Sequence, residues 1–297
     1  MSADLKKTIL VTGANGQLGR EFQELSANYP SYHFLFLSRE ELPIDDARAI
    51  HNLFEKQQIH YCINCAAYTA VDKAESEKEK AFLINADAVG LLASECRKHN
   101  AKFIHISTDY VYDGSQRKPL KEDNAVAPLN VYGLSKLKGT QRALEENPEA
   151  LIIRTSWVYS FYGHNFVKTM LRLLNEKESI KVINDQQGCP TYAADLAKVI
   201  MNFVEGTEKN EKYSGIVNYC NAGVTTWFDF ATAIREYINS SCEVIPVSTS
   251  EYPTPAKRPQ YSVLETSKIK AMLHIDIPSW KDSLYKCLDK LTTKSER

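Results

Sequence analysis

The first half of the chain alternates continuous apolar segments with amphipathic ones, and this alternation constrains the fold more than any other feature. The apolar runs predict strands at residues 7–12, 32–37, 61–65, 102–107 and 151–155. Between them, apolar residues at helical spacing predict helices, at residues 17–26, 47–56, 78–100 and 131–146. Strands without polar alternation are buried on both faces, and helices that connect them produce parallel strand-helix-strand units. We therefore predict an α/β protein with a doubly wound parallel sheet.

After Trp157 this alternation becomes irregular. One strand, at 215–220, is predicted, together with helices at 166–174, 193–204, 226–238, 266–273 and 279–291. A Pro-rich stretch at 252–259 interrupts the pattern and predicts irregular structure. We therefore divide the chain into a sheet domain at 1–156 and a smaller lobe at 157–297. Segments near 182–220 are expected to return to the sheet.

Composition excludes several classes of protein. The 297 residues are 43% hydrophobic and 25% charged, which excludes a mostly disordered chain. The formal net charge of −1 gives no support to a nucleic-acid partner, because domains that bind polyanions usually carry a basic excess. No apolar run reaches the roughly 20 residues that cross a bilayer, so no membrane association is expected.

The seven cysteines are an odd number. We expect no secretion signal, because the first apolar run, at residues 9–11, is too short for the apolar region of one and a Gly-rich turn follows it. We expect reduced thiols and a cytoplasmic protein. Cys62 and Cys65 form a C-x-x-C pair, but they fall at the end of a predicted buried strand. A redox pair requires a solvent-facing turn, so we interpret these two cysteines as structural.

A glycine-rich turn directly follows the first strand and opens the first helix. Gly13, Gly16 and Gly19 have the spacing G-x-x-G-x-x-G. Glycines at such a turn let the backbone approach a pyrophosphate at the helix N-terminus, where free N–H groups face the anion. The motif predicts dinucleotide binding by a Rossmann-type domain.

A second motif, Tyr132 with Lys136 four residues later, places both side chains on one face of a predicted helix. A free tyrosine has a pKa near 10 and is a poor acid at neutral pH. A nearby lysine favours the phenolate and is expected to lower that pKa. Thr108 ends a predicted parallel strand at the edge where such folds bind ligands, and its hydroxyl can polarise a carbonyl beside Tyr132.

Together these motifs resemble the extended branch of the short-chain dehydrogenase/reductase superfamily, which acts on nucleotide sugars. Longer strings resemble the dTDP-4-dehydrorhamnose reductase family within that branch, at residues 64–75, 107–112, 127–133, 154–159, 165–170 and 253–259. The resemblance covers nearly the whole chain. It implies reduction of the 4-keto group of dTDP-4-dehydro-β-L-rhamnose to dTDP-L-rhamnose, a reaction of dTDP-rhamnose and polysaccharide biosynthesis, with NADPH or NADH as the reductant.

The resemblance also implies roles for single residues. Tyr132 is the expected proton donor, Lys136 tunes it and binds the nicotinamide ribose, and Thr108 bonds the keto oxygen. The remaining cofactor-binding residues are expected to be Gly13, Gly16, Gln17, Leu18, Gly19, Ala67, Tyr68 and Thr69. The sugar nucleotide is expected to contact Val71, Asp109, Tyr110, Trp157, Asn165 and Arg258, in addition to Thr108 and Tyr132.

The segment after the second strand predicts which cofactor is preferred. Ser38 and Arg39 come first there, and the acidic residue is delayed to Glu40. An acid at this place bonds the adenosine ribose and repels a 2′-phosphate, whereas a guanidinium accepts the phosphate. We therefore expect NADPH to be preferred, with NADH tolerated. The alternative is that Arg39 is a solvated residue paired with Glu40 or Glu41.

The chain departs from the family at two places. Some members hold magnesium at a dimer contact through three glutamates. Glu21 matches the first position here, the second falls at or beside Ala194, with Asp195 as a possible substitute, and the third falls near Lys290. A lysine does not ligate a hard cation, so we predict no metal site, and a homodimer of that kind loses its support. The acidic residue that often touches adenine is replaced by Pro43, although Asp45 or Asp46 could substitute.

Two other functions remain open at this point. A nucleotide-sugar epimerase or dehydratase shares the fold, but a dehydratase has an acidic residue where this chain has Tyr110. A non-catalytic regulatory homologue, similar to the regulatory subunit of methionine adenosyltransferase, shares the family resemblance. The complete set of Thr108, Tyr132 and Lys136 favours an enzyme over such a subunit.

Overall fold

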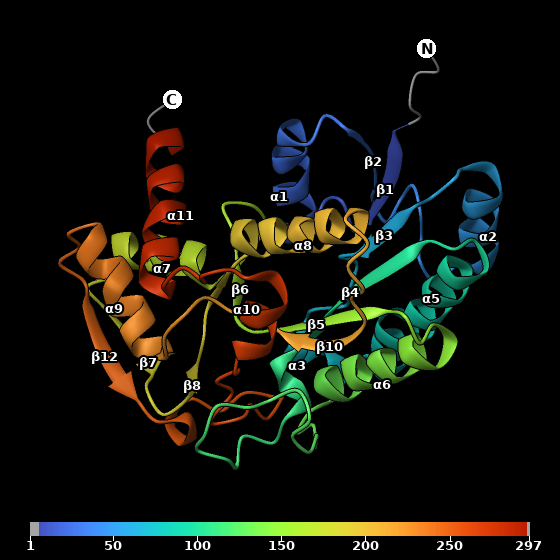
Figure 1. Ribbon diagram of the computed structural model, residues 1–297. Helices are drawn as coiled ribbons and strands as arrows, with labels where there is room; N and C mark the ends of the chain where they lie inside the picture. The colour runs from blue at the N-terminus through green and yellow to red at the C-terminus, as the bar shows by residue number, and fades with distance from the viewer. Residues whose placement is uncertain (1–5, 296–297) are drawn as a thin grey trace.

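The computed structural model describes residues 6–295, and its centre is a sheet of six parallel strands in the order β10-β5-β4-β3-β1-β2 (Figure 1). These strands are β1 (Lys7–Thr12), β2 (Tyr32–Leu37), β3 (Tyr61–Asn64), β4 (Lys102–Thr108), β5 (Leu151–Thr155) and β10 (Gly215–Asn218). The chain turns outward from β1 to β2 and then crosses to β3, so the direction of winding reverses between β1 and β3. The predicted doubly wound parallel sheet is confirmed.

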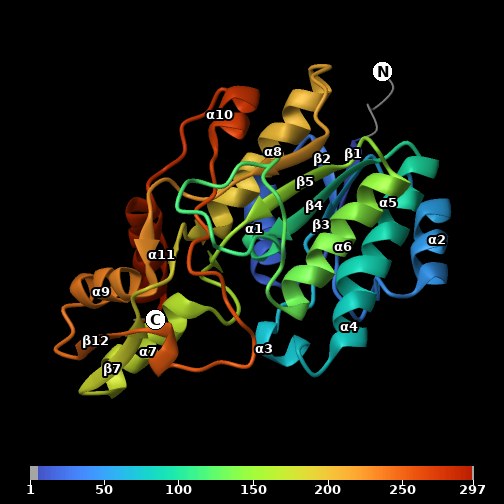
Figure 2. The same cartoon turned by 90° about the horizontal axis from the view of Figure 1, so that it is seen from below.

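Helices cover both faces of the sheet (Figure 2). One face carries α1 (Gln17–Leu25) and α8 (Ala193–Glu208), and the other carries α2 (Ala47–Lys56), α5 (Ala88–Lys98) and α6 (Val131–Glu146). The strands serve both faces because successive side chains point to opposite sides. Ile9 and Val11 belong to the apolar cluster under α1 and α8, whereas Leu10 belongs to the cluster under the other helices.

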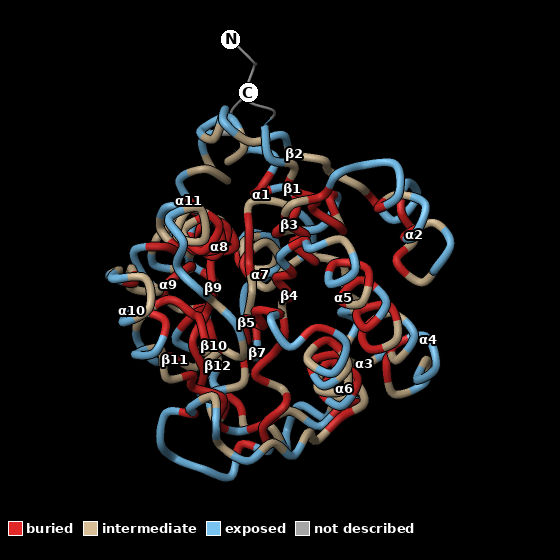
Figure 3. Tube along the Cα trace, turned by 45° about the vertical axis from the view of Figure 1, so that its right-hand side comes forward, coloured by how far each residue is buried: buried red, intermediate tan, exposed pale blue. Residues whose placement is uncertain are grey.

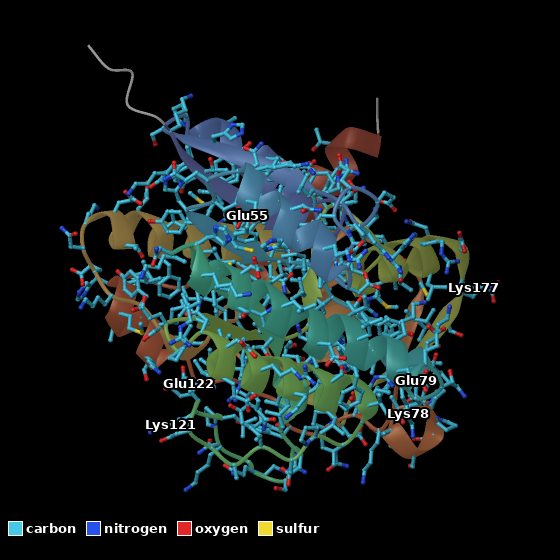
Figure 4. The ribbon with its side chains drawn as sticks, turned by 90° about the vertical axis from the view of Figure 1, so that its right-hand side faces the viewer. Glu55, Lys78, Glu79, Lys121, Glu122 and Lys177 are labelled. Atoms are coloured by element: carbon cyan, nitrogen blue, oxygen red, sulfur yellow. The ribbon has the colours of Figure 1, made fainter. Side chains whose placement is uncertain are left out.

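Burial follows these layers. Figure 3 shows the buried trace gathered around β3, β4 and α8 in the interior of the molecule. Figure 4 looks onto the outer helices, where the labelled Glu55 of α2 and the labelled Lys78 and Glu79 of α4 (Lys78–Phe82) lie at the solvent side. These three residues are exposed, as the polar face of a surface helix requires.

The helix predicted at 78–100 is interrupted by a π-helical turn. It consists of α4, the π-helical segment η2 (Leu83–Asp87) and α5. The wide turn presents Asn85 inward, where its side chain donates to the Tyr68 carbonyl and accepts from the Tyr68 N–H. Its carbonyl lies so close to Gly139 of α6 that a Cβ there would be 1.9 Å from the oxygen. The break therefore serves a close contact between two helices.

The C-terminal lobe has its own apolar core beside the sheet. Helices α7 (Phe166–Glu176), α9 (Trp227–Tyr237) and α11 (Trp280–Ser295) surround two parallel strands, β7 (Ser179–Ile183) and β12 (Glu243–Val247). The sequence did not predict these strands: β7 alternates over only five residues, and β12 contains Pro246, which cannot donate to a strand ladder.

The remaining elements are short. They are α3 (Val71–Ala74), α10 (Ser267–Leu273), the 3-10 turns η1 (Ser26–Asn28), η3 (Asp109–Val111) and η4 (Thr249–Glu251), and the two-residue strands β6 (Val158–Tyr159), β8 (Gln187–Gly188), β9 (Thr191–Tyr192) and β11 (Thr225–Thr226). Helix η3 directly follows β4 and begins the edge of the sheet where the site lies.

The second half of the chain contributes to both parts of the molecule. Helix α8 packs on the sheet and β10 pairs with β5, although both follow residue 157. The boundary between 156 and 157 stays a prediction, since the chain crosses between the two parts more than once. Among the residues described, no helix combines the length and apolar character needed to cross a membrane.

Candidate active site

Two adjoining cavities open at the carboxyl ends of the parallel strands. The large cavity has a volume of about 600 Å³ and lies against β3, β4, η3 and α6. The small cavity, of about 280 Å³, lies beyond the Gly-rich turn. Gly16, Cys65, Ala66 and Ala67 line both, so the two form one continuous groove across the point where the winding reverses. Ligands bind at this place in doubly wound sheets.

The Gly-rich turn has the geometry that a dinucleotide requires. Gly13 has φ +64°, and a Cβ there would lie 2.7 Å from the Ala66 nitrogen. Gly16 is the N-cap of α1 and offers no side chain to the free N–H groups of the helix, which leaves them for an anion. Gly19 lies off the cavities and allows α1 to pack closely, since a Cβ would be 2.5 Å from the Gly13 carbonyl.

The groove therefore fits a dinucleotide on the geometry of this chain: a glycine cradle with no side-chain atoms, an uncapped helix N-terminus, and two connected cavities that span it. Gln17, Leu18 and Thr69 line the large cavity, and Tyr68 lines the small one. Thirteen of the predicted site residues face one of the cavities besides Gly13 and Gly16, namely Gln17, Leu18, Arg39, Ala67, Tyr68, Thr69, Val71, Thr108, Asp109, Tyr110, Tyr132, Lys136 and Trp157.

Ser38 and Arg39 separate in the structure. Arg39 is exposed and lines the small cavity. Ser38 is buried and lies outside both cavities, so the structure does not place it against a cofactor. Its N–H donates to Glu41 at 2.8 Å, which binds that carboxylate to Ser38. Lys80 also lines the small cavity and adds a second cation to its wall.

Thr108, Tyr132 and Lys136 meet at the wall of the large cavity. Thr108 ends β4, and Tyr132 and Lys136 lie one turn apart on α6. Asn130 caps this helix by accepting from the Gly133 N–H at 2.7 Å. Gly133 is required beside Tyr132, because a Cβ would lie 2.2 Å from the Tyr110 carbonyl oxygen. The close approach of α6 to η3 therefore positions Tyr132 next to Thr108.

The electrostatics of this wall differ from the expectation for Tyr132. Burial raises the pKa of Tyr132 to about 12, and the Thr108 hydroxyl opposes this rise. Burial lowers the pKa of Lys136 to about 7. Lys136 therefore does not depress the Tyr132 pKa here, because its Nζ bonds the Ile106 carbonyl and His105. Tyr132 is a protonated acid near neutral pH.

Asp109 lies beside these groups, buried to 2% exposure. Burial raises its pKa to about 7, against the opposing effect of hydrogen bonds that include one from Thr108. Its Oδ2 has no hydrogen-bond partner within the described structure. Ionisation of this carboxyl therefore places a buried negative charge next to the cavity and costs free energy.

Two stacked tryptophans form a second wall of the large cavity. Trp157 has a left-handed backbone with φ +49°, which is rare for a bulky residue. Its indole stacks on that of Trp227, with ring centroids 3.6 Å apart, and both line the large cavity. Gly188 lies under the indole of Trp157, where a Cβ would be 2.6 Å away. The packing thus fixes Trp157 in a strained conformation.

Two predicted ligand-binding residues are engaged elsewhere in the structure. Asn165 caps α7 and donates to Gln17 at 2.9 Å, so it joins the lobe to the Gly-rich turn. Arg258 makes a bidentate ion pair with Asp72, at 3.0 and 2.7 Å. Neither lines either cavity. Their assignment to the nucleotide remains a prediction that requires these side chains to exchange partners.

Sequence reasoning missed other residues in the cavity walls. They include Asn64, Cys65, Ile106, His164, Leu196 and Trp227 in the large cavity, and Leu42, Ile44, Lys80 and Ile84 in the small one. Asp45 lines the small cavity and Asp46 caps α2, so of the two acids weighed as substitutes at Pro43 only Asp45 faces the cavity. No sequence motif around His164 or Trp227 indicates a cavity-lining residue, since each reaches the site only through the packing of the lobe.

Glu21 is buried and accepts a hydrogen bond from the Ser160 hydroxyl at 2.5 Å. The Lys290 ammonium lies 3.9 Å from Glu21 and pairs with Glu24. Burial raises the pKa of Glu21, and Lys290 opposes that rise. Across the described part of the chain, no group of three or more His, Cys, Asp and Glu side chains could hold a metal ion.

Comparison with known proteins agrees with this geometry. The family model described as RmlD substrate binding domain matches residues 7–293. The dTDP-4-dehydrorhamnose reductase of Aggregatibacter actinomycetemcomitans is 38% identical over 284 residues, covering 93% of this chain and 96% of that one. The spore coat polysaccharide biosynthesis protein SpsK of Bacillus subtilis is 38% identical over 262 residues, covering 88% and 90%.

A solved structure extends the comparison. The crystal structure of dTDP-4-dehydrorhamnose reductase from Bacillus anthracis, in complex with NADP, has a TM-score of 0.91 and 37% identity, and the match covers 96% of this chain and 100% of that one. Similarity of this extent in both sequence and structure, over almost the full length, establishes the family. This chain belongs to the dTDP-4-dehydrorhamnose reductase family.

Proposed function

We propose that this chain reduces the 4-keto group of dTDP-4-dehydro-β-L-rhamnose to give dTDP-L-rhamnose, with NADPH as the reductant. The observation that carries the proposal is the convergence of Thr108, Tyr132 and Lys136 on a cavity continuous with the Gly-rich turn. Family membership supports it, since the relatives are named for this reaction. A polysaccharide role is supported by the similarity to SpsK, and the free state of all seven cysteines supports the predicted cytoplasmic location.

In the proposed reaction Tyr132 gives its hydroxyl proton to the keto oxygen. Its raised pKa keeps the proton on the phenol at neutral pH, ready for transfer to the developing alkoxide. The Thr108 hydroxyl, beside Tyr132, donates to Asp109 Oδ1 in the free chain and must leave that partner to donate a second hydrogen bond to the same oxygen. Bound NADPH supplies the hydride for the carbonyl carbon. Lys136 binds the nicotinamide ribose and stabilises the phenolate once the proton has left.

The groove also provides residues for the pyrophosphate and 2′-phosphate of the cofactor and for the sugar of the second substrate. Gly13, Gly16, Gln17 and Leu18 hold the cofactor pyrophosphate against the start of α1. Arg39 binds the 2′-phosphate at the small cavity, which supports a preference for NADPH. Val71, Tyr110 and the stacked tryptophans contact the sugar of the second substrate.

The cavity argues against a dehydratase. Asp109 is the one acidic side chain among the described residues that line the large cavity, and it is followed by Tyr110. Elimination of water requires one group to take a proton from carbon and another to protonate the leaving hydroxyl. One carboxyl, buried and with a raised pKa, does not supply both.

NADPH oxidation across a panel of 4-keto sugar nucleotides tests the proposal. We expect the purified chain alone to oxidise NADPH with dTDP-4-dehydro-β-L-rhamnose, to prefer it over other keto sugars, and to yield dTDP-L-rhamnose. Activity with NADPH only on another sugar nucleotide would replace the substrate. Activity that needs a partner protein, or none at all, would support the regulatory homologue.

A further inference from the structure

A chain of buried polar side chains runs from the sheet to Lys136 and takes no part in the reaction described above. It comprises Thr12 of β1, Asn64 of β3 and His105 of β4, all at most 1% exposed. The Thr12 hydroxyl donates to Asn64 Oδ1 at 2.7 Å, Asn64 Nδ2 lies 3.0 Å from His105 Nδ1, and His105 Nε2 lies 3.2 Å from Lys136 Nζ. Buried polar groups of this kind require matched donors and acceptors.

The Ala66 N–H determines which atoms donate and which accept along this series of hydrogen bonds. It lies 3.2 Å from Asn64 Oδ1 and 3.4 Å from the Thr12 hydroxyl oxygen, and a backbone N–H can only donate, so an amide nitrogen at the nearer position would oppose donor to donor. The atom facing it must therefore be the amide oxygen, which places the amide nitrogen of Asn64 against His105. That nitrogen is a donor only, so His105 Nδ1 must carry a lone pair. The single ring proton of a neutral His105 is then on Nε2.

This tautomer points an N–H at Lys136. The amine form of lysine has a lone pair that accepts such a bond, whereas the ammonium form has none. Lys136 also donates to the Ile106 carbonyl, which either form can do. A protonated imidazole is excluded by Asn64 on one side and disfavoured by Lys136 on the other, in agreement with the strongly lowered pKa of His105.

We infer that Asn64 and His105 are positioning residues that keep Lys136 in its uncharged amine form until a cofactor is bound. Among the described residues, the other titratable group that acts on Lys136 is Cys65 after β3, with a raised thiol pKa. Tyr132, one turn before Lys136 on α6, is a neutral phenol next to Asp109. The inference rests on the proposed function, in which Lys136 binds the cofactor ribose. A lysine that leaves His105 for the ribose has three donors as an ammonium, one more than the amine offers, so cofactor binding takes up a proton.

The tautomer of His105 is measured directly by NMR on the free, wild-type enzyme labelled with ¹⁵N-histidine. The His105→Gln variant identifies its signals, and His33→Gln, at an exposed site on β2, is the matched control. We expect the Nε2–H tautomer across neutral pH. The Nδ1–H tautomer or an imidazolium would overturn the inference. In Asn64→Asp the carboxylate only accepts, so the proton should move to Nδ1.

Proton uptake is the second measurement. We expect NADPH binding, followed by calorimetry in buffers of different ionisation enthalpy about one pH unit above the Lys136 pKa, to take up close to one proton per site. Lys136→Met gives the contribution of the cofactor itself, and Asn64→Asp should lose most of the uptake. Equal uptake in wild type and Lys136→Met would overturn the inference. The proposed function fails separately, since keto-sugar reduction can be absent while His105 has the expected tautomer.

Discussion

The two walls of the large cavity are built in different ways. Thr108, Tyr132 and Lys136 come from β4 and α6, which are adjacent in the sheet domain and held by local caps and glycine contacts. The second wall, with Trp157 and Trp227, is assembled from segments far apart in the chain. The first wall carries the groups to which we assign proton transfer, and the second carries apolar surface. The placement of the polar groups is thus determined by local sequence in β4 and α6. The shape of the cavity depends instead on how the C-terminal lobe packs.

The sharpest test of the first wall is Tyr132→Phe. Loss of the proton donor is expected to lower kcat roughly 10²–10⁴-fold, while the Kd for NADPH stays nearly unchanged because only the hydroxyl is removed. Stopped-flow oxidation of NADPH and a fluorescence titration measure the two quantities. Tyr213→Phe, outside both cavities, is the control. A variant that keeps near-normal turnover would remove Tyr132 from the proposed mechanism.

Asp109→Asn tests the electrostatics of the same wall. The pKa of Asp109 is raised from 3.8 to about 7, so the wild-type chain loses stability as pH rises from about 4 to about 7. The asparagine cannot ionise and avoids this loss, which amounts to roughly 4 kcal/mol for a shift of about three pKa units. Denaturant unfolding at several pH values should show a variant advantage that grows between these limits and then levels. A constant difference would contradict the raised pKa.

Trp227→Ala breaks the second wall. Without the stacking partner the strained backbone of Trp157 should relax, and the KM for the sugar nucleotide is expected to rise about tenfold, from the loss of roughly 1.4 kcal/mol of aromatic contact. The KM for NADPH should not change. Trp227→Phe keeps a ring and should restore most of the loss. If both substrates are affected equally, the pair supports the fold rather than the sugar pocket.

Arg39→Ala, at the far end of the groove, is expected to have the smallest effect. The KM for NADPH should rise several-fold, because a charge-assisted bond to the 2′-phosphate is lost at an exposed site. The KM for NADH should be nearly unchanged. Arg48→Ala, an exposed arginine on α2 outside both cavities, is the matched control. A wild-type preference for NADH would refute the assignment of Arg39.

The sequence predicts the first wall well because its signals are local. Gly13 and Gly16 mark a turn that only glycine permits, and the spacing of Tyr132 and Lys136 places both on one helical face. The strand order and the carboxyl-end position then follow from general rules for parallel sheets. These rules predict that Thr108 lies near Tyr132, and the prediction does not depend on the structure of the C-terminal lobe.

The rest depends on contacts that no local pattern records. The engagement of Arg258 by Asp72 joins residues 186 positions apart, and that of Asn165 by Gln17 joins residues 148 positions apart. The π-helical turn at Asn85 responds to Gly139 on another helix. From the sequence, His105 is only one residue of a predicted buried strand. Its link to Lys136 arises from the register of β3 against β4, in which Asn64 pairs with His105.

The late arrival of β10 has a consequence for synthesis of the protein. Residues 215–218 complete the edge of the sheet beside β5, after the chain has already built part of the lobe. A fragment that stops at residue 156 would leave β5 with an unpaired edge and would lack α8 over one apolar face, a combination that favours aggregation. During synthesis, the six-stranded sheet therefore lacks its edge strand β10 until residue 218 has left the ribosome.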